Sequence, residues 1–433
     1  MNWNEQLRQS VIETRNRRKE QVIITRSLKI DFDKCNKRTK FYFDRIFDEA
    51  KWIKNDSLYR GNVDPNKALK EVTVRYKKNN EWYTEVQPIL VLPSQSQMLA
   101  KKELTAANRS LDSKKFRGKN AGEIKFFKEV NSIHYLQSHT YKLKRNNDNI
   151  ITHVQLAKNK QWLKVSGGKQ IQNVDEIISI KLIRKPSGMY INVMFCIHKD
   201  RLDEWYNSFR KDKVTELKEV CGVDLGIKTT CAVSDNEFNQ NRFNYNIRIA
   251  DPDYLNRTKS KLKRSLKAIK RTEKYKNDNN YRSNNYIKLL HEYNKCREKV
   301  TYKKKTKAQQ LVGYLKNNYK IIAFQDELLT GWFKESHFKK YMMQSALGTI
   351  KANLKYLVTL GRAVMVSSNM QTTNQCPCCD HQTNTPLENR TFICDNCGFS
   401  DNRDFKSADM MIKFAGFKLD TSKILNHQVK SFA

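Results

Sequence analysis

The sequence predicts a multidomain α+β protein with an α/β domain in its C-terminal half. Short runs that alternate apolar and polar residues fill 150–198, as is typical of antiparallel strands. A buried strand, a glycine-flanked turn and a second strand follow near residue 220, which predicts a β-hairpin that opens the α/β domain. The chain has 433 residues, enough for two to four domains with real cores.

The net charge indicates the kind of partner. Lys and Arg number 82 against 45 Asp and Glu, a formal charge of +37. Repulsion among so many positive charges favours the binding of a polyanion, and we expect that polyanion to be nucleic acid. An anionic membrane surface is the weaker alternative, because the basic residues are spread along the whole chain. No apolar run approaches the length of a membrane span and the chain starts with polar residues, so we expect a soluble, intracellular protein without a membrane partner.

The N-terminal elements are predicted from their periodicity. Residues 21–31 should form a strand, and 37–59 and 94–113 should form helices. The first helix should turn its large side chains inward: Phe41, Phe43, Ile46, Phe47 and Trp52. Residues 114–128 should then form a basic loop in which cations such as Lys115 and Arg117 are interleaved with phenylalanines, a mixture that suits phosphate and base contacts. A core role for the adjacent Phe126 and Phe127 is an equally good interpretation.

The second half begins with the hairpin and continues with a very basic helical stretch at 258–307. A solvated charged helix is the simpler interpretation. So many lysines without acidic partners, however, favour contact with the phosphate backbone of a nucleic acid. The candidate contacts are Lys263, Arg264, Lys267 and Lys270. A buried strand from 319, a helix at 344–361, a strand at 362–368 and a last helix from 406 complete the chain.

Two C-x-x-C pairs near the end predict a zinc site. Cys376 and Cys379 form the first pair and Cys394 and Cys397 the second, with 14 residues between the pairs. In a reducing compartment such clusters indicate metal ligands, and four thiolates suit tetrahedral Zn²⁺. A redox pair or buried thiols are the alternative. Cys378 and His381 could replace a ligand, although their spacing is poorer.

Acidic residues follow or interrupt buried strands, where they are costly unless a cation neutralises them. The first is Asp224 in the hairpin; Asp326 and Glu327 end a strand, and Asp401 and Asp404 precede the last helix. Three carboxylates from three segments of one α/β domain can hold two Mg²⁺ for attack on a phosphodiester. A cap or a turn is the simpler interpretation of any single Asp.

These segments resemble the RuvC-type, RNase H-like nuclease domain of the transposon-encoded TnpB proteins and of the miniature type V CRISPR effectors. The resemblance is carried by GVDLGIKTTCAVSD, IIAFQDELLTGW, the cysteine pairs and SDNRDFKSADMM, and by the place of the ribbon between the second and third acidic motifs. It is fainter toward the N-terminus, where SQMLAKKELTAANRSLD is similar to the family's recognition helices and IISIKLIRKPSGMYINVMFCI to its wedge strands.

The resemblance implies a domain layout. Residues 1–212 should form a β-barrel-like wedge domain with a helical recognition insertion, whose helices lie at about 35–130. Residues 213–370 and 401–433 should form the RuvC-like domain, and 371–400 an inserted zinc ribbon that binds target nucleic acid.

The second acidic motif departs from the family. Members of the family commonly have Glu-Asp-Leu after the second strand, whereas residues 325–328 of this chain are Gln-Asp-Glu-Leu. On a strand, Gln325 and Glu327 point to one face and Asp326 to the other. Glu327 therefore reaches the side of the usual Glu and is the preferred ligand, with Asp326 left open.

The third motif departs as well, because Lys406 stands where the family has Asn. The carboxylate of Asp404 is kept, and Asp401 is the second choice. The resemblance thus implies that Asp224, Glu327 and Asp404 hold Mg²⁺.

By resemblance, the chain is an RNA-guided DNA endonuclease. It should bind a guide RNA, read a short motif beside the target, and cut double- and single-stranded DNA selected by base pairing. Whether two copies share one RNA is left open. The resemblance implies a prokaryotic, cytoplasmic protein that joins the nucleoid when it binds DNA. A nuclease-dead, RNA-guided repressor is the second hypothesis, disfavoured because an acid is kept at each motif, and a DNA transposase is the third.

Overall fold

The computed structural model describes residues 3–61, 64–78, 81–136, 138–209, 216–236, 242–277, 281–332, 338–386 and 389–420. The chain divides into two compact units. Unit 1 comprises Met1–Lys211 and Arg264–Ile287, and unit 2 comprises Asp212–Lys263 and Lys288–Ala433. The domain boundary expected at 212/213 lies outside the described residues.

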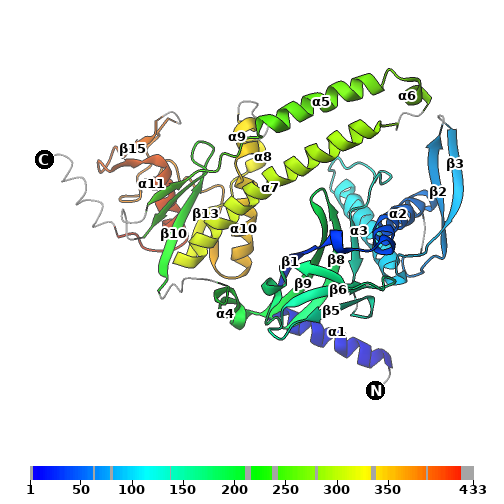
Figure 1. Ribbon diagram of the computed structural model, residues 1–433. Helices are drawn as coiled ribbons and strands as arrows, with labels where there is room; N and C mark the ends of the chain where they lie inside the picture. The colour runs from blue at the N-terminus through cyan, green and yellow to red at the C-terminus, as the bar shows by residue number, and fades with distance from the viewer. Residues whose placement is uncertain are drawn as a thin grey trace. The chain divides into compact units, whose positions relative to one another are not determined.

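Seven antiparallel strands form the main sheet of unit 1, in the order β4-β8-β9-β1-β7-β6-β5 (Figure 1). They are β1 (Gln21–Ile30), β4 (Ser132–Tyr135), β5 (Tyr141–Arg145), β6 (Ile151–Leu156), β7 (Leu163–Ser166), β8 (Glu176–Lys185) and β9 (Gly188–His198). In β9, every second side chain from Met189 to Phe195 is buried, so one face of the strand builds the core. The strands predicted at 21–31 and over 150–198 are confirmed.

Four helices of unit 1 are α1 (Trp3–Lys19), α2 (Lys37–Arg60), α3 (Ser94–Phe116) and α4 (Leu202–Asn207). Short 3₁₀ turns occupy Phe32–Lys34, Ser138–Thr140, Gly168–Ile171 and Lys199–Arg201. The α2 helix starts where the Asn36 side chain accepts a hydrogen bond from the Thr39 N–H at 2.8 Å, and it ends at Gly61, whose φ of +72° suits glycine. Both predicted helices are confirmed.

The inward face of α2 was predicted correctly only in part. Phe43, Ile46 and Phe47 are buried, but Phe41 is 60% exposed, so its predicted core position is wrong. Two residues rotate an α-helix by about 200°, which puts Phe41 on the opposite side from Phe43. Trp52 is half-buried, and the guanidinium of Arg45 lies 4.4 Å from its ring centroid.

Unit 1 also contains an additional two-stranded sheet between α2 and α3. It consists of β2 (Glu71–Lys78) and β3 (Glu81–Pro88), which pair antiparallel. The sequence carries a signal for it, since runs rich in β-branched and aromatic residues flank Asn79 and Asn80. The helical interpretation of 35–130 did not include it.

Unit 2 is built on a mixed five-stranded sheet in the order β12-β11-β10-β13-β14 (Figure 1). Its strands are β10 (Lys218–Leu225), β11 (Cys231–Asp235), β12 (Phe243–Tyr245), β13 (Tyr319–Gln325) and β14 (Ala363–Val366). The first three pair antiparallel, whereas β13 and β14 run parallel to β10. The predicted hairpin near 220 is therefore β10 and β11.

The helices of unit 2 include α8 (Leu329–Trp332), α9 (Lys339–Gln344), α10 (Leu347–Thr359) and α11 (Arg403–Phe414). The basic stretch forms α5 (Asp253–Ile269), α6 (Glu273–Asn277) and α7 (Asn284–Asn318); α5 and α7 each cross the boundary between the units. One face of the sheet packs against α7 and α10 through Val223, Phe324, Leu311 and Leu354. On the other face, Ala323 packs against Met411 of α11.

A small module precedes α11. Its strands β15 (Thr391–Ile393) and β16 (Ser400–Asn402) pair antiparallel. The boundary expected at 400/401 falls inside β16. No helix in the described part of the chain is long and apolar enough to cross a membrane.

Candidate active site and metal centre

The two faces of the mixed sheet separate the acidic residues. Along β10, Val223 points into the core shared with α7 and α10, so Gly222 and Asp224 point to the face that α11 covers. The helix comes so close that a Cβ on Gly222 would lie 1.8 Å from the carbonyl oxygen of Ala408. A side chain at 222 would therefore displace α11, whose first turn carries Asp404.

Asp224 lies close enough to Asp404 and to Glu327 for the charges to interact. The three carboxylates are farther apart than the ligands of one metal ion, since the cysteine cluster is the one metal-sized group among the described residues. Burial, followed by the negative charges of Asp404 and Glu327, raises the pKa of Asp224 to about 7, while Arg403 and Lys406 oppose the shift. Burial also raises the pKa of Glu327. Shielded carboxylates that repel one another are in the electrostatic state that a bound cation relieves.

Asp326 is engaged on the opposite side of the strand end. Lys351 and Lys355 of α10 pair with its Oδ1 at 2.6 and 2.9 Å. Hydrogen bonds from these two lysines hold the pKa of Asp326 below its ordinary value. Within the described residues, the Glu327 carboxylate has no comparable ion pair. This geometry agrees with the preference for Glu327, and the ligand assignment stays a prediction.

Asp401 is also engaged elsewhere. The Arg242 guanidinium lies 2.8 Å from Asp401 and 2.6 Å from Asp409, and its Nε donates to Ser234 Oγ at 3.1 Å. Burial raises the pKa of Asp409 to about 7, against the opposing effect of Arg242. One buried guanidinium thus connects α11, β11 and β16, and Asp401 has a structural partner.

The four cysteines of the C-x-x-C pairs converge. The Sγ atoms of Cys376, Cys379, Cys394 and Cys397 all lie within 4.8 Å of one another. Cys376 and Cys397 are 3.6 Å apart and Cys379 and Cys394 are 3.5 Å apart, measured between Sγ atoms. A Zn–S bond of about 2.3 Å in a tetrahedron requires Sγ separations of roughly 3.8 Å, so the cluster fits Zn²⁺.

The backbone has the same hydrogen bond and the same turn conformation at both C-x-x-C pairs. The N–H of Cys376 donates to His381 O at 2.9 Å, and the N–H of Cys394 donates to Phe399 O at 2.8 Å. The residue after each pair has a positive φ, +59° at Asp380 and +71° at Gly398. Each turn therefore directs two thiols to the same point. Cys378 and His381, the alternative ligands, are outside the cluster found among the described residues.

Lys406 connects this module to α11. Its side chain is fully buried and donates to the carbonyl oxygens of Thr372, Thr373 and Gln375 at 2.9, 2.5 and 3.1 Å. Its Nζ also lies 4.2 Å from the ring centroid of Phe392. Burial lowers the pKa of Lys406 to about 8. The family's Asn could not reach three carbonyl groups in this way, so the substitution has a structural role.

Two further arginines of this site carry no sequence signal. Arg390 pairs with Asp404 at 3.2 Å, and Arg242 is the buried cation described above. Both come from irregular segments or short strands without periodicity, and only the fold brings them to the acidic residues.

The six cations predicted to bind nucleic acid are all exposed. They are Lys115 and Arg117 at the end of α3, and Lys263, Arg264, Lys267 and Lys270 on α5 or directly after it. On α5, Leu262 and Ile269 are buried, which leaves the basic side chains on the outer face. The cations are accessible to phosphates, and the contacts themselves stay a prediction.

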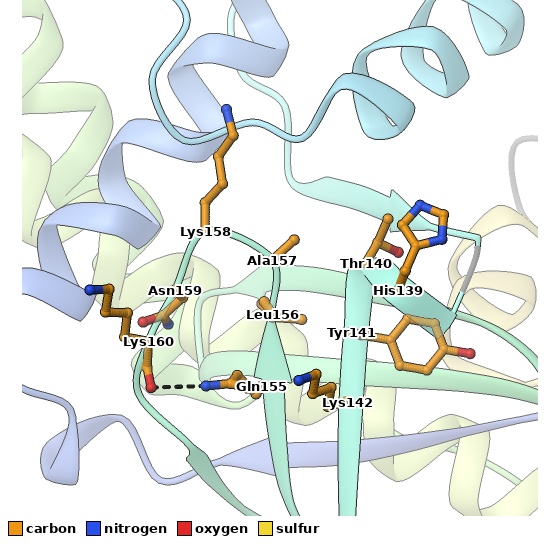
Figure 2. A pocket seen from close by; sticks show the side chains of 10 residues that line it. All are labelled: His139, Thr140, Tyr141, Lys142, Gln155, Leu156, Ala157, Lys158, Asn159 and Lys160. Carbon is orange, nitrogen blue, oxygen red and sulfur yellow. Dashed lines mark hydrogen bonds between the residues drawn. The ribbon is translucent and has the colours of Figure 1, made fainter.

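A cavity of about 240 Å³ lies at the β5–β6 hairpin of unit 1 (Figure 2). Its lining contains Lys142, Lys158, Lys160 and His139 and no carboxylate. Such a lining suits an anion and not a metal ion. One of these cations already has a partner in the protein, because the Nζ of Lys158 donates a hydrogen bond to Leu90 O at 3.1 Å.

The C-terminal module can be compared with known families. Residues 348–411 match the family model described as Cas12f1-like, TNB domain. Residues 348–411 are thus similar to the TNB domain of Cas12f1-like proteins. The matched segment runs from α10 through β14 and the cysteine cluster into α11, and includes Asp404. The match confirms the resemblance to the miniature type V effectors and their TnpB-like relatives.

Solved structures of similar size were also found. One is a Cas12f1–sgRNA–target DNA complex, 12% identical, with 90% of this chain and 99% of that chain covered and a TM-score of 0.45. Another is CasPhi-2 (Cas12j) bound to crRNA, 11% identical, with 91% and 98% covered and a TM-score of 0.39. These TM-scores are too low to extend the TNB match to the rest of the chain. No curated protein matches the chain.

Proposed function

We propose that the chain is an RNA-guided DNA endonuclease whose chemistry takes place at Asp224, Glu327 and Asp404. The observation that supports the proposal is the charge interaction of Asp224 with Asp404 and with Glu327. Asp224 comes from β10, Glu327 follows β13 and Asp404 lies in the first turn of α11. The neighbouring acids Asp326 and Asp401 form closer ion pairs, at 2.6 and 2.8 Å, than the 3.2 Å pair between Asp404 and Arg390.

The strand arrangement supports the same proposal. An antiparallel β12-β11-β10 meander continued by the parallel strands β13 and β14 is the order expected of an RNase H-like, RuvC-type domain. In that domain, two Mg²⁺ would activate water and stabilise the leaving oxygen of a phosphodiester. The carboxylates fit this role because they are oxygen ligands, and the charges of Asp404 and Glu327 help to raise the pKa of Asp224.

The chain's own residues position this site. Gly222 allows α11 to approach the sheet, and Lys406 holds its first turn against the segment that enters the cysteine module. The Cys376–Cys397 cluster would hold one Zn²⁺ and keep this module folded next to Asp404. In the proposal, the exposed cations of α3 and α5 contact guide RNA or DNA backbones.

The test is to purify the protein with its co-bound RNA, sequence that RNA, and incubate the complex with a plasmid that matches it. We expect cleavage that requires Mg²⁺ and the matching sequence. Light scattering of the same complex shows whether one or two chains share an RNA. A complex that binds the matched plasmid tightly but never cuts it, in Mg²⁺ or Mn²⁺, would instead identify a guided repressor.

A further inference from the structure

The β2–β3 ribbon of unit 1 has two chemically different faces. The pairing register puts Thr73, Arg75, Trp82, Thr84 and Val86 on one face, here called the arginine face. The opposite face carries Tyr76 and Tyr83, whose rings stack at 5.9 Å, together with Glu81 and Glu85. The acids of the ribbon therefore lie mainly on the face away from Arg75; Glu71, at the base of the arginine face, is the exception.

Arg75 is held between two aromatic rings. Its guanidinium carbon lies 4.3 Å from the ring centroid of Tyr59, on α2, and 5.3 Å from that of Trp82. Both rings are unusually open, with Tyr59 53% and Trp82 63% exposed. Stacking uses the flat face of a guanidinium and leaves its in-plane N–H donors available. No hydrogen bond or ion pair of Arg75 is found in the described part of the chain.

The base of the ribbon is fixed to α2. Glu49 is fully buried, and its carboxylate accepts hydrogen bonds from the backbone N–H groups of Leu90, Val91 and Leu92 at 2.7–3.0 Å. On the arginine face, Arg60 Nη2 donates to Thr73 Oγ1 at 3.2 Å. The segment that follows β3 and the base of the arginine face are therefore both hydrogen-bonded to α2.

We propose that the β2–β3 ribbon enters the major groove of duplex DNA and that Arg75 donates two hydrogen bonds to a guanine there. The major groove of B-DNA admits a two-stranded ribbon, and bidentate pairing with guanine O6 and N7 is the commonest specific contact of arginine. The deep, narrow major groove of A-form RNA does not admit side chains in this way. A cationic, acid-poor face complements the phosphates that flank the groove.

This inference deepens the proposed function, on which it rests for the choice of DNA as the partner. It assigns Arg75 the reading of a base beside the target, with Tyr59 and Trp82 as positioning residues. In the proposal, contacts with these two rings orient the N–H donors of Arg75 before DNA binds. This reduces the entropic cost of binding.

The test is a binding selection from random duplex DNA without Mg²⁺, using the purified full chain. The wild-type protein should enrich a sequence that contains guanine, and Arg75→Ala should lose the preference at that position by about 5- to 150-fold, the equivalent of about 1–3 kcal/mol. Arg75→Lys should keep the affinity for DNA but lose most of the preference. Arg38→Ala, at another exposed arginine in α2, is the matched control and should change nothing.

A second arm replaces the selected guanine by 7-deazaguanine, which lacks the N7 acceptor. The replacement should weaken binding by the wild type and leave Arg75→Ala unaffected. If Arg75→Ala enriches the same sequences as the wild type, or weakens all duplexes equally, the inference is overturned. If Trp82→Ala instead dissociates a dimer of the free chain, the face binds a second copy. The selection needs neither a guide nor cleavage, so the two proposals can fail separately. If only the endonuclease proposal fails, the protein does not cut DNA but still shows an Arg75-dependent preference for guanine in the selection.

Discussion

Asp326 and Glu327 are adjacent, yet their surroundings give them different chemistry. Asp326 is neutralised by two lysines of α10, whereas Glu327 has a raised pKa and, among the residues that the structure describes, no cation pairs with its carboxylate as closely. Asp326 pairs with α10, whereas the charge of Glu327 acts on Asp224 of β10.

Glu327→Gln should therefore reduce Mg²⁺-dependent cleavage of a guide-matched plasmid by more than about 100-fold, because even partners of a metal ligand typically matter by 10–100-fold. Asp224→Asn and Asp404→Asn should behave alike, with target binding retained. Asp326→Asn is the matched control and should keep activity. Loss of cleavage in Asp326→Asn with full activity in Glu327→Gln would reverse the assignment.

Asp409 should make stability depend on pH. Its pKa is raised to about 7, so at intermediate pH the folded protein keeps a proton that the unfolded chain has lost. This contribution is complete below about pH 4 and is lost as the pH rises to about 7. The melting temperature of the wild type should fall between about pH 4 and pH 7, and Asp409→Asn should flatten that fall. If the melting temperatures of the wild type and of Asp409→Asn changed equally with pH, this prediction would be contradicted.

At the scale of elements, α11 links the acidic site to the cysteine module. It packs on β10 at Gly222, carries Asp404 in its first turn, and is tied through Lys406 to the segment that leads into the module. Disturbing the module should therefore disturb the position of Asp404.

Metal analysis should find about one zinc per chain, as four thiolates in one cluster require. Cys376→Ser or Cys394→Ser should release the metal and lower the melting temperature, because zinc binding contributes folding free energy. Cys378→Ser is the control within the same segment and should keep both. A metal-free protein that melts and cuts like the wild type would remove the zinc assignment.

At the scale of the whole molecule, the net charge of +37 dominates. The basic side chains of α5 are exposed while its apolar residues are buried, so this charge is available to a polyanion. Counterion release then makes the affinity for nucleic acid depend steeply on salt.

Charge reversal at Lys263, Arg264, Lys267 and Lys270 should weaken RNA and DNA binding without changing sequence preference. If each contacts one phosphate, the slope of log affinity against log salt should decrease by about 3, since each contact contributes about 0.7–0.9. Replacement of the same lysines by arginine should keep the slope. An unchanged slope after reversal would show that α5 does not contact the phosphates.

The sequence by itself determined the features that depend on local spacing. The cysteine pairs, the strands over 150–198, the hairpin at Asp224 and the basic helices could all be predicted, because each is encoded within a few turns or one strand length. The choice of Glu327 over Asp326, which the alternation suggested, stays a prediction.

Only the tertiary structure decided which distant residues meet. Arg242, Arg390 and Lys406 reach the acidic site or its support through packing across the sheet, which no local pattern encodes. The same is true of Phe41, whose exposure depends on which face of α2 is covered, and of Arg75, whose two aromatic neighbours come from α2 and β3. The physical reason is that periodicity fixes how a side chain is directed from its own element, whereas its partners are fixed by long-range contacts between elements.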